Sequence, residues 1–301
     1  MMNDREQITA IENGLSVLAP AKINLSLLIA GKRPDGYHEI ETIMAKVNFF
    51  DELLIHHGQK KGIELTCKGP QWAPDGEDNL VYKAAELFFS HCLMRNDINI
   101  TLIKNIPAGS GLGSASSDAA AALIGLNRFF ATNLSHEIMT RLAAELGSDV
   151  AFFLNGPLAM CRGRGEKIEE IEEKFDFFTL ILLPNVSVST KTVYANYKHD
   201  RNLYNKLSSE IRGFIEKNRI DFVAKMCANM LAKSCFDLVK SLAELKKRVE
   251  SLGVKPCCLS GSGSAIFCIF DKNEEEKARH YKLILEENVD CKSIIVSNIR
   301  W

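Results

Sequence analysis

The segment PAGSGLGSASSDAA, residues 107–120, is the feature that most restricts what this chain can fold into. Gly109, Gly111 and Gly113 alternate with other residues directly before an alanine-rich stretch. Glycine lets backbone N–H groups come close to a ligand, and the start of a helix favours an anion through its free N–H groups and its dipole. The segment therefore predicts a loop that cradles phosphate groups and continues into a helix.

The loop differs from the two best-known phosphate loops. It lacks the Gly-Lys-Ser/Thr ending of a Walker A sequence, and its glycines follow a GxGxG spacing rather than the GxGxxG of dinucleotide-binding proteins. A flexible glycine-serine turn is the plain alternative. The direct passage into an alanine-rich helix favours phosphate binding.

Two other segments carry charged residues in apolar surroundings. Lys22 lies in LAPAKINL, and Asp149 lies in ELGSDVAFFLNG next to the apolar run 150–153. Taken singly, each has a plain structural interpretation, a lysine reaching solvent at a strand end and a helix N-cap aspartate. Buried charges need partners, so together they suggest an ion pair beside the phosphate loop in which the lysine tunes the carboxylate.

A second glycine-serine segment, LSGSGSAIF at residues 259–267, lies between two apolar runs. It predicts strand, turn and strand. The turn is either an ordinary tight hairpin or a second loop of backbone donors close to a substrate.

The spacing of apolar residues predicts mixed secondary structure. Strands are expected within 15–30, separated there by an irregular turn at Pro20 and Lys22, and in further segments at 43–57, 97–103, 177–184 and 293–297. Helices are expected at 79–92, 136–146, 208–218, 234–251 and 273–287, in addition to the one after the glycine loop. Strands and helices do not alternate regularly, which favours an α+β fold, with an N-terminal domain at 1–165 and a C-terminal domain at 166–301.

Composition excludes several classes of protein. The net charge is −1, from 37 basic and 38 acidic residues, so no nucleic-acid partner is expected and any recognition of anions must be local. No apolar stretch approaches the roughly 18 residues of a membrane span, and no secretory signal pattern is present. The nine cysteines show no metal-ligand spacing, so we expect reduced, mostly buried thiols, no metal site built from protein side chains alone, and a cytoplasmic protein with no membrane partner.

The three segments APAKINL, IPAGSGLGSASSDAA and LSGSGSAIF, in this order, resemble the GHMP kinase superfamily, which includes galactokinase, homoserine kinase and mevalonate kinase. Within it, other segments resemble the branch that phosphorylates cytidylated methylerythritol in the non-mevalonate route to isoprenoid precursors. These are AKINLSLLIAGKRPDGYHEIETI at 21–43, EDNLVYKAA at 77–85, the SSDAA ending and LGSDVAFFL at 146–154. The triplet Gly36-Tyr37-His38 is the sharpest discriminator.

The resemblance implies two α+β domains with a cleft between them, and ATP and Mg²⁺ in that cleft. It assigns Lys22 and Asp149 to catalysis, and Asn79 and Lys104 to the adenine side. The ATP phosphates would be wrapped by Pro107, Ala108, Gly109, Ser110, Gly111, Leu112, Gly113, Ser114, Ala115, Ser116 and Ser117.

The acceptor's cytosine would be held by Tyr37, His38 and Tyr194, since aromatic rings stack on a base and an imidazole can read its polar edge. For Tyr194, a core aromatic side chain is the plain alternative. Two other functions are weighed: a kinase of another small alcohol such as homoserine or mevalonate, and a non-catalytic nucleotide-binding protein on the same fold. The second would be expected to lose the lysine or the aspartate, and both are present.

Overall fold

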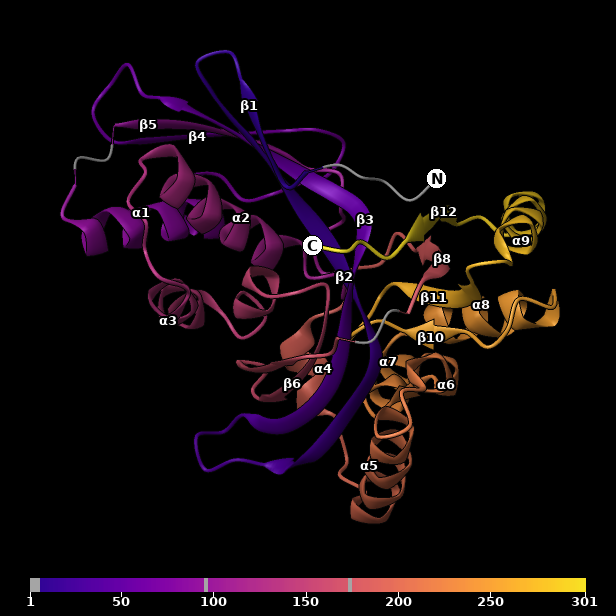
Figure 1. Cartoon of the computed structure of the whole chain (residues 1–301). Coiled ribbons are helices and arrows are strands. Elements are labelled where there is room, and N and C mark those ends of the chain that lie inside the picture. Colours follow the sequence, from indigo (N-terminus) through magenta and orange to yellow (C-terminus); the bar gives the residue numbers. More distant parts are fainter. Residues whose placement is uncertain (1–5, 95–96, 173–174) are drawn as a thin grey trace.

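Two long antiparallel strands, β2 (Gly14–Lys32) and β3 (His38–His57), run through the centre of the molecule (Figure 1). The structure is a computed structural model that describes residues 6–94, 97–172 and 175–301. A turn at Pro34, Asp35 and Gly36 joins these two strands, and Gly36 N donates to Arg33 O at 3.1 Å. The two strands together carry the first motif into the middle of the protein.

The turn expected within residues 15–30 is wrong, because β2 continues through it. The pairing of β2 with β3 shifts register between Pro20 and Ala21, and again between Asn24 and Ser26. Proline has no N–H to donate to a sheet and is tolerated at such bulges. The strand therefore bends at Pro20 instead of ending there.

The first sheet has the order β1-β2-β3-β5-β4, and three further strands extend it: β6 pairs with β3, β7 with β6, and β9 with β2. Its remaining strands are β1 (Ile8–Ile11), β4 (Ile63–Lys68), β5 (Ile98–Ile103), β6 (Leu158–Gly163), β7 (Lys167–Glu170) and β9 (Ala228–Asn229). An apolar core joins this sheet to α1 (Leu80–Cys92), α2 (Ser114–Phe129) and α3 (His136–Leu146), which lie together on one side of it in Figure 1.

The second sheet is antiparallel, with the order β10-β11-β8-β12. Its strands are β8 (Phe177–Leu183), β10 (Cys258–Leu259), β11 (Ile266–Asp271) and β12 (Lys292–Ser297). The helices of this half are α4 (Thr190–Ala195), α5 (Arg201–Ile215), α6 (Ile220–Met226), α7 (Ala232–Leu238), α8 (Lys240–Ser251) and α9 (Glu275–Asn288). The α+β prediction is confirmed.

The two halves share structure. Strand β9, from the second half of the chain, pairs with β2, and one apolar core extends from Ala21 to Val296. The predicted boundary at residue 165 lies in the turn between β6 and β7, two strands of the same sheet. That boundary stays a prediction.

The expectation of reduced thiols is wrong for one pair: Cys227 and Cys258 form a disulfide. They are 31 residues apart in sequence, and the left-handed residue Cys227 that ends α6 brings its Cα within 4.8 Å of the Cα of Cys258. Cysteine spacing alone gives no sign of such a contact. Buried free thiols lie nearby, with Cys257 Sγ and Cys268 Sγ 3.1 Å apart.

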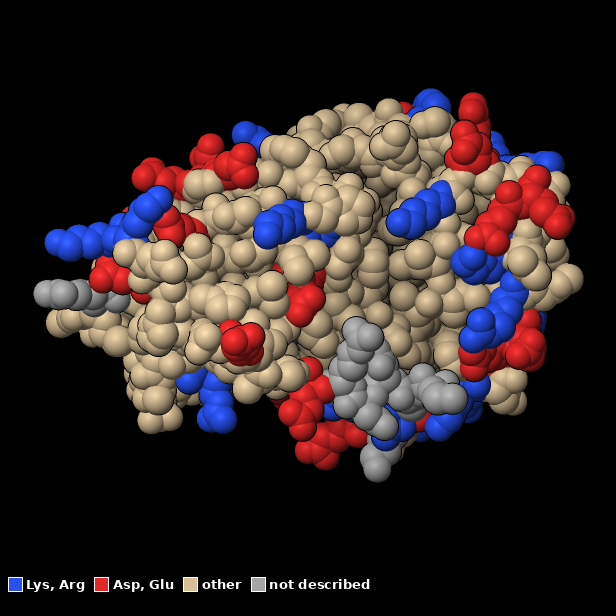
Figure 2. All heavy atoms as spheres, turned by 90° about the horizontal axis from the view of Figure 1, so that it is seen from above, with Lys and Arg blue, Asp and Glu red and all other residues tan. Residues whose placement is uncertain are grey.

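Charged side chains of both signs are interspersed on the face of the molecule seen in Figure 2. No continuous basic patch crosses the described residues on that face. Within the described ranges, none of the helices has the length and apolar character needed to cross a membrane.

Candidate active site

A cavity of about 1080 Å³ lies where the two halves meet. Its walls come from β2, the β2–β3 turn, the glycine loop, the segment before η2 (Ala151–Leu154), α4, and the loop between β10 and β11. Fourteen of the eighteen residues proposed from the sequence line it: Lys22, Tyr37, His38, Pro107, Ala108, Gly109, Ser110, Gly111, Gly113, Ser114, Ala115, Ser116, Asp149 and Tyr194. The second glycine-serine turn contributes Gly261 and Ser262.

The cavity is positive although the chain is nearly neutral. Its charged lining residues are four basic side chains against two carboxylates: Lys22, Lys32, Arg164 and Lys191 against Asp35 and Asp149. Within the described part of the chain, no ion pair engages Lys32, Arg164 or Lys191. The local field therefore favours anionic ligands. This agrees with the expectation that a nearly neutral chain recognises anions only at a local site.

The glycine loop leads into α2 as predicted, and its conformation needs glycine. Gly111 has φ +78°, and a Cβ at this position would lie 2.1 Å from the backbone oxygen of Ser260. Gly113, the N-cap of α2 at φ +75°, offers no side chain to cap the first turn of the helix. The N–H groups of that turn are therefore available to an anion in the cavity.

Lys22 is buried at the floor of the cavity. Its Nζ donates to Asn24 Oδ1 at 2.6 Å and to Gly111 O at 2.8 Å, and lies 3.9 Å from Asp149 Oδ2. Burial lowers the pKa of Lys22, while Asp149 acts in the opposite direction. The ion pair expected between these two residues is present.

Asp149 is more open than its partner, with 36% of its side chain exposed against 4% for Lys22. It lies in the connection between α3 and η2, where Val150, not Asp149, caps η2. Gly165, at φ +124°, passes so close that a Cβ there would lie 3.5 Å from Asp149 Oδ1. The carboxylate thus faces the cavity, next to the backbone that follows β6.

The other end of the cavity is aromatic. The His38 ring lies 5.2 Å from the ring of Tyr194 and 5.9 Å from that of Tyr197, and the guanidinium of Arg164 lies 5.0 Å above the Tyr37 ring. Burial, together with Lys32 and His199, lowers the pKa of His38, which favours the neutral imidazole. A neutral imidazole can both donate and accept a hydrogen bond.

Four proposed residues do not line the cavity: Asn79, Lys104, Leu112 and Ser117. Leu112 packs in the core, and Ser117 Oγ is buried with no hydrogen-bond partner among the described residues. The Asn79 side chain caps α1 by accepting from Val81 N at 2.9 Å. A role of these residues in nucleotide binding stays a prediction.

Lys104 belongs to a buried cluster of charged groups. Its Nζ binds Asp51 Oδ2 at 2.5 Å and Asp118 Oδ2 at 2.6 Å, and it also contacts the Ser114 hydroxyl. Burial alone would lower the pKa of Lys104, but Asp118 and Asp51 outweigh it and raise that pKa. Burial raises the pKa of Asp118 well above its usual range. The cluster supports the first turn of α2 from behind.

The sequence reasoning missed two lining residues next to Lys22, namely Asn24 and Thr42. Asn24 lies two residues beyond Lys22 in the same strand, and alternate residues of a strand share a face. That spacing was the available signal. Thr42 lies on the neighbouring strand, and the bulges that set the register between β2 and β3 leave no local signal in the sequence.

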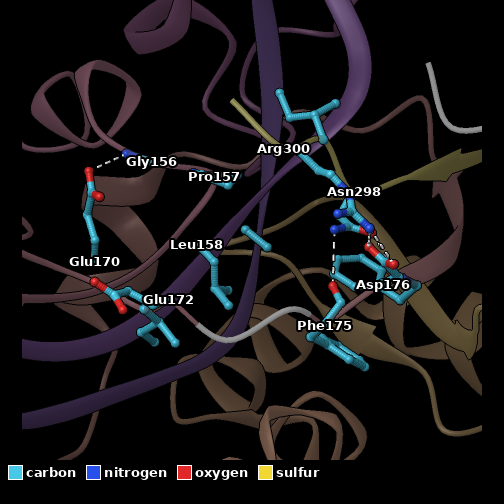
Figure 3. Close-up of a pocket in the computed structure, with 13 residues that line it drawn as sticks. Gly156, Pro157, Leu158, Glu170, Glu172, Phe175, Asp176, Asn298 and Arg300 are labelled. Carbon is cyan, nitrogen blue, oxygen red and sulfur yellow. Dashed lines mark hydrogen bonds and ion pairs between the residues drawn. The ribbon is translucent and has the colours of Figure 1, made fainter. Parts of the chain in front are cut away.

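A second, smaller hollow of about 310 Å³ lies between the β6–β7 hairpin and the C-terminal segment (Figure 3). Its polar groups bind one another: Gly156 N donates to Glu170 Oε1 at 2.6 Å, and Arg300 binds Asp176 Oδ2 at 2.7 Å. It contains none of the eighteen site residues proposed from the sequence. The first bond closes the base of the β6–β7 hairpin, and the second ties the C-terminal segment to the start of β8, so both stabilise the fold.

This fold, with a glycine loop that lines its cavity and leads into a helix, is that of a GHMP-type kinase. The family model described as "GHMP kinases N terminal domain" matches residues 79–157, and the one described as "GHMP kinases C terminal" matches residues 211–281. Kinases of this class use ATP as the phosphate donor for small-molecule acceptors.

Relatives give a finer assignment. The chain is 35% identical over 257 residues to a 4-diphosphocytidyl-2-C-methyl-D-erythritol kinase of Clostridium botulinum, covering 85% of this chain and 91% of that one. It is 36% identical over 252 residues to the enzyme of the same name from Bacillus subtilis, covering 83% and 86%. The chain belongs to the family of 4-diphosphocytidyl-2-C-methyl-D-erythritol kinases.

Solved structures agree with this placement. A 4-(cytidine 5'-diphospho)-2C-methyl-D-erythritol kinase superposes with a TM-score of 0.73 at 29% identity, covering 95% of this chain and all of the other. A homoserine kinase from Cytophaga hutchinsonii superposes with a TM-score of 0.75 at 20% identity, covering 97% and 96%. That second likeness concerns the fold alone.

Proposed function

We propose that the protein transfers the γ-phosphoryl group of ATP to the 2-hydroxyl of 4-diphosphocytidyl-2-C-methyl-D-erythritol. One observation carries the proposal: a lysine–aspartate pair, a glycine phosphate loop and an aromatic-imidazole cluster line the same cavity. The family relationship supports this acceptor over homoserine and mevalonate.

The chemical step needs positioning more than covalent chemistry. The acceptor oxygen forms a bond to the γ-phosphorus while the bond from that phosphorus to the β–γ bridging oxygen breaks, and ADP leaves. Asp149 orients the hydroxyl and takes its proton. Lys22, held by Asn24 and Gly111, directs its positive charge toward the same point and offsets the negative charge that develops there.

The backbone of the glycine loop and the first turn of α2 hold the phosphates. Mg²⁺ fits here, because it binds proteins through one or two oxygen ligands and takes the rest from phosphates and water. The described residues hold no cluster of three or more metal-ligating side chains, but the glycine-loop hydroxyl of Ser116 lines the cavity. That hydroxyl would hold the ion, which neutralises phosphate charge when bound.

The aromatic end binds the cytosine in this proposal. Tyr37 and Tyr194 supply stacking surface, and the neutral His38 reads the polar edge of the base. The unpaired cations of the cavity favour an acceptor that carries a diphosphate. Mevalonate and homoserine carry no nucleobase, so a kinase of either has no use for the aromatic-imidazole cluster.

A coupled assay of ADP release tests the proposal. With ATP and Mg²⁺, we expect turnover with cytidylated methylerythritol and very little with mevalonate or homoserine. Asp149→Asn should lower turnover by roughly 10²–10⁴-fold, the usual contribution of a positioned acid–base group, at an unchanged melting temperature. Asp290→Asn, at an exposed position, is the matched control. Comparable turnover with homoserine, or an active Asp149→Asn variant, would contradict the proposal.

A further inference from the structure

A chain of buried hydrogen bonds leads away from Lys22 into the sheet. Lys22 Nζ donates to Asn24 Oδ1 at 2.6 Å, Asn24 Nδ2 donates to Thr42 Oγ1 at 2.8 Å, and the Thr42 hydroxyl donates to Ser26 O at 2.5 Å. The residues of this hydrogen-bond chain are buried, and none is more than 4% exposed: Lys22, Asn24, Ser26 and Thr42. The chain therefore operates without competition from bulk water.

The bond from Thr42 to Ser26 O fixes the direction of the other hydrogen bonds in this chain. A hydroxyl has one hydrogen, and Thr42 uses it on the carbonyl oxygen of Ser26. Thr42 Oγ1 can then only accept from Asn24, which obliges the Asn24 amide to present its NH₂ group to Thr42. The amide oxygen consequently points to Lys22.

This direction matters because the Asn24 amide could otherwise turn over. The flipped amide would direct its NH₂ group at the ammonium of Lys22, and two donors facing each other repel. Two of the three N–H donors of Lys22 are taken by Asn24 Oδ1 and Gly111 O. The third is left for Asp149 and the acceptor hydroxyl.

We infer that Thr42 is a positioning residue for the phosphoryl transfer, and that it acts by fixing the orientation of the Asn24 amide and thereby that of the Lys22 ammonium. The inference rests on the proposed function for its kinetic consequence. Its structural part, the control of Lys22 by Thr42, can be measured without any substrate.

The kinetic test compares Thr42→Val with Thr42→Ser. Valine keeps the shape and removes the hydroxyl, so we expect kcat to fall by roughly ten- to a hundredfold while KM for ATP stays nearly unchanged. Serine keeps the hydroxyl and should restore most of kcat. A rise in the acceptor KM at unchanged kcat would overturn the inference, because it would make Thr42 a binding residue.

The matched control is Thr179→Val. Thr179 is equally buried, in β8 of the second sheet, and its hydroxyl has no hydrogen-bond partner among the described residues. Thr179→Val removes the same hydroxyl group from a buried strand position away from the cavity, so kcat should not change. Equal loss of kcat in both valine variants would show a general packing effect and refute a specific role of Thr42.

The substrate-free test follows Lys22 by NMR titration of ¹³Cε-labelled lysine, with the signal assigned through Lys22→Met. The groups that act on Lys22 are the Asp149 carboxylate and the Cys161 thiol, the latter on the strand residue paired with Thr42, and Thr42→Val replaces neither residue. Loss of a firmly held acceptor removes stabilisation of the charged form, so the pKa of Lys22 should fall further in Thr42→Val and return in Thr42→Ser.

The two tests fail separately. If the wild-type protein does not phosphorylate cytidylated methylerythritol, the proposed function fails, while the Lys22 titration still decides the role of Thr42. An unchanged Lys22 titration in Thr42→Val overturns the inference even if the wild-type protein has the proposed activity. Should Thr42→Val not fold, Thr42→Cys, close in shape and a weaker donor, takes its place in both measurements.

Discussion

At the scale of single residues, two features of the structure require glycine at position 111. Its φ of +78° favours glycine, and a Cβ would lie 2.1 Å from Ser260 O. Because Ser260 O is a backbone atom, it cannot move away without shifting the chain. We therefore expect Gly111→Ala to lower the free energy of unfolding by about 1–3 kcal/mol and to weaken ATP binding, since the loop must shift. Urea denaturation and calorimetric titration with ATP measure the two effects.

Gly62→Ala is the control that separates the cost of a positive φ from the cost of a close contact. Gly62 has φ +104°, but no atom lies within 4 Å of the position that a Cβ would occupy there. It should show only the cost of the backbone conformation and bind ATP normally. If Gly111→Ala folds and binds ATP as tightly as the wild-type protein, the loop is a turn and not a phosphate cradle.

Lys46 gives a prediction about pH. Burial lowers the pKa of Lys46 to about 8, and its Nζ donates to Phe153 O at 3.2 Å and Asn155 O at 2.6 Å. The unfolded chain, with a pKa near 10.5, therefore binds more protons between pH 8 and 10.5, and the free energy of unfolding should rise with pH across this window.

The contribution from Lys46 should be about 3 kcal/mol, complete near pH 10.5 and lost as pH falls through 8. Lys46→Met removes the titrating group, so the pH dependence of its unfolding free energy should be flatter by this amount. Urea denaturation of both proteins at pH 8 and pH 10 gives the comparison. Parallel curves for the two proteins would refute the assignment.

At the scale of elements, the sequence predicts most where a pattern is local. The limits of α3, His136–Leu146, follow from its apolar spacing and from Ser135, which caps it by accepting from Ile138 N. The helix expected at 208–218 begins earlier, at Arg201, because Asp200 caps it by accepting from Leu203 N at 2.9 Å. The continuous path of β2 through Pro20 depends on its pairing with β3, which no local pattern contains.

Lys104 shows the same limit within the candidate site. Family resemblance assigns it to the adenine side of the nucleotide, which stays a prediction, and the structure buries it beside Asp51 and Asp118. Its contacts with Asp51 and Asp118 join residues far apart in sequence, so their burial follows from packing and not from spacing. Thr42 was missed because its contact with Asn24 depends on the pairing of β2 with β3, whereas Lys22 and Asp149 each lie in a sequence motif of their own.

We expect Lys104→Met to be strongly destabilising. It would leave two buried carboxylates, Asp51 and Asp118, without their cation, and breaking a buried pair in this way costs about 3–5 kcal/mol. Lys83→Met, on the exposed side of α1, is the control and should change stability little. Chemical denaturation measures both. A Lys104→Met protein as stable as the control would show that the cluster does not support α2.

At the scale of the whole molecule, the cavity is assembled from distant parts of the chain. The glycine loop is bound to the β10–β11 loop, since Ser260 Oγ donates to Gly111 O at 2.9 Å and Ala265 N donates to Ser110 O at 2.9 Å. Thr190 in α4 lies 2.9 Å from Ser262 in the same loop. The sequence left open whether the second glycine-serine turn reaches the site, and the contacts that bring it there come from the packing of both halves.

The two halves should therefore unfold together. Strand β9 completes the sheet of the first half, and residues of β2 such as Ile23 and Leu25 pack in a core shared with the second. Calorimetry should show one transition whose van't Hoff and calorimetric enthalpies agree, and ATP at 100 times its Kd should stabilise it by about 2.7 kcal/mol. The fragment 1–165 alone should not fold stably, because it would expose that core. Two transitions, only one of which responds to ATP, would instead establish independent domains, with the cavity as a late contact between them.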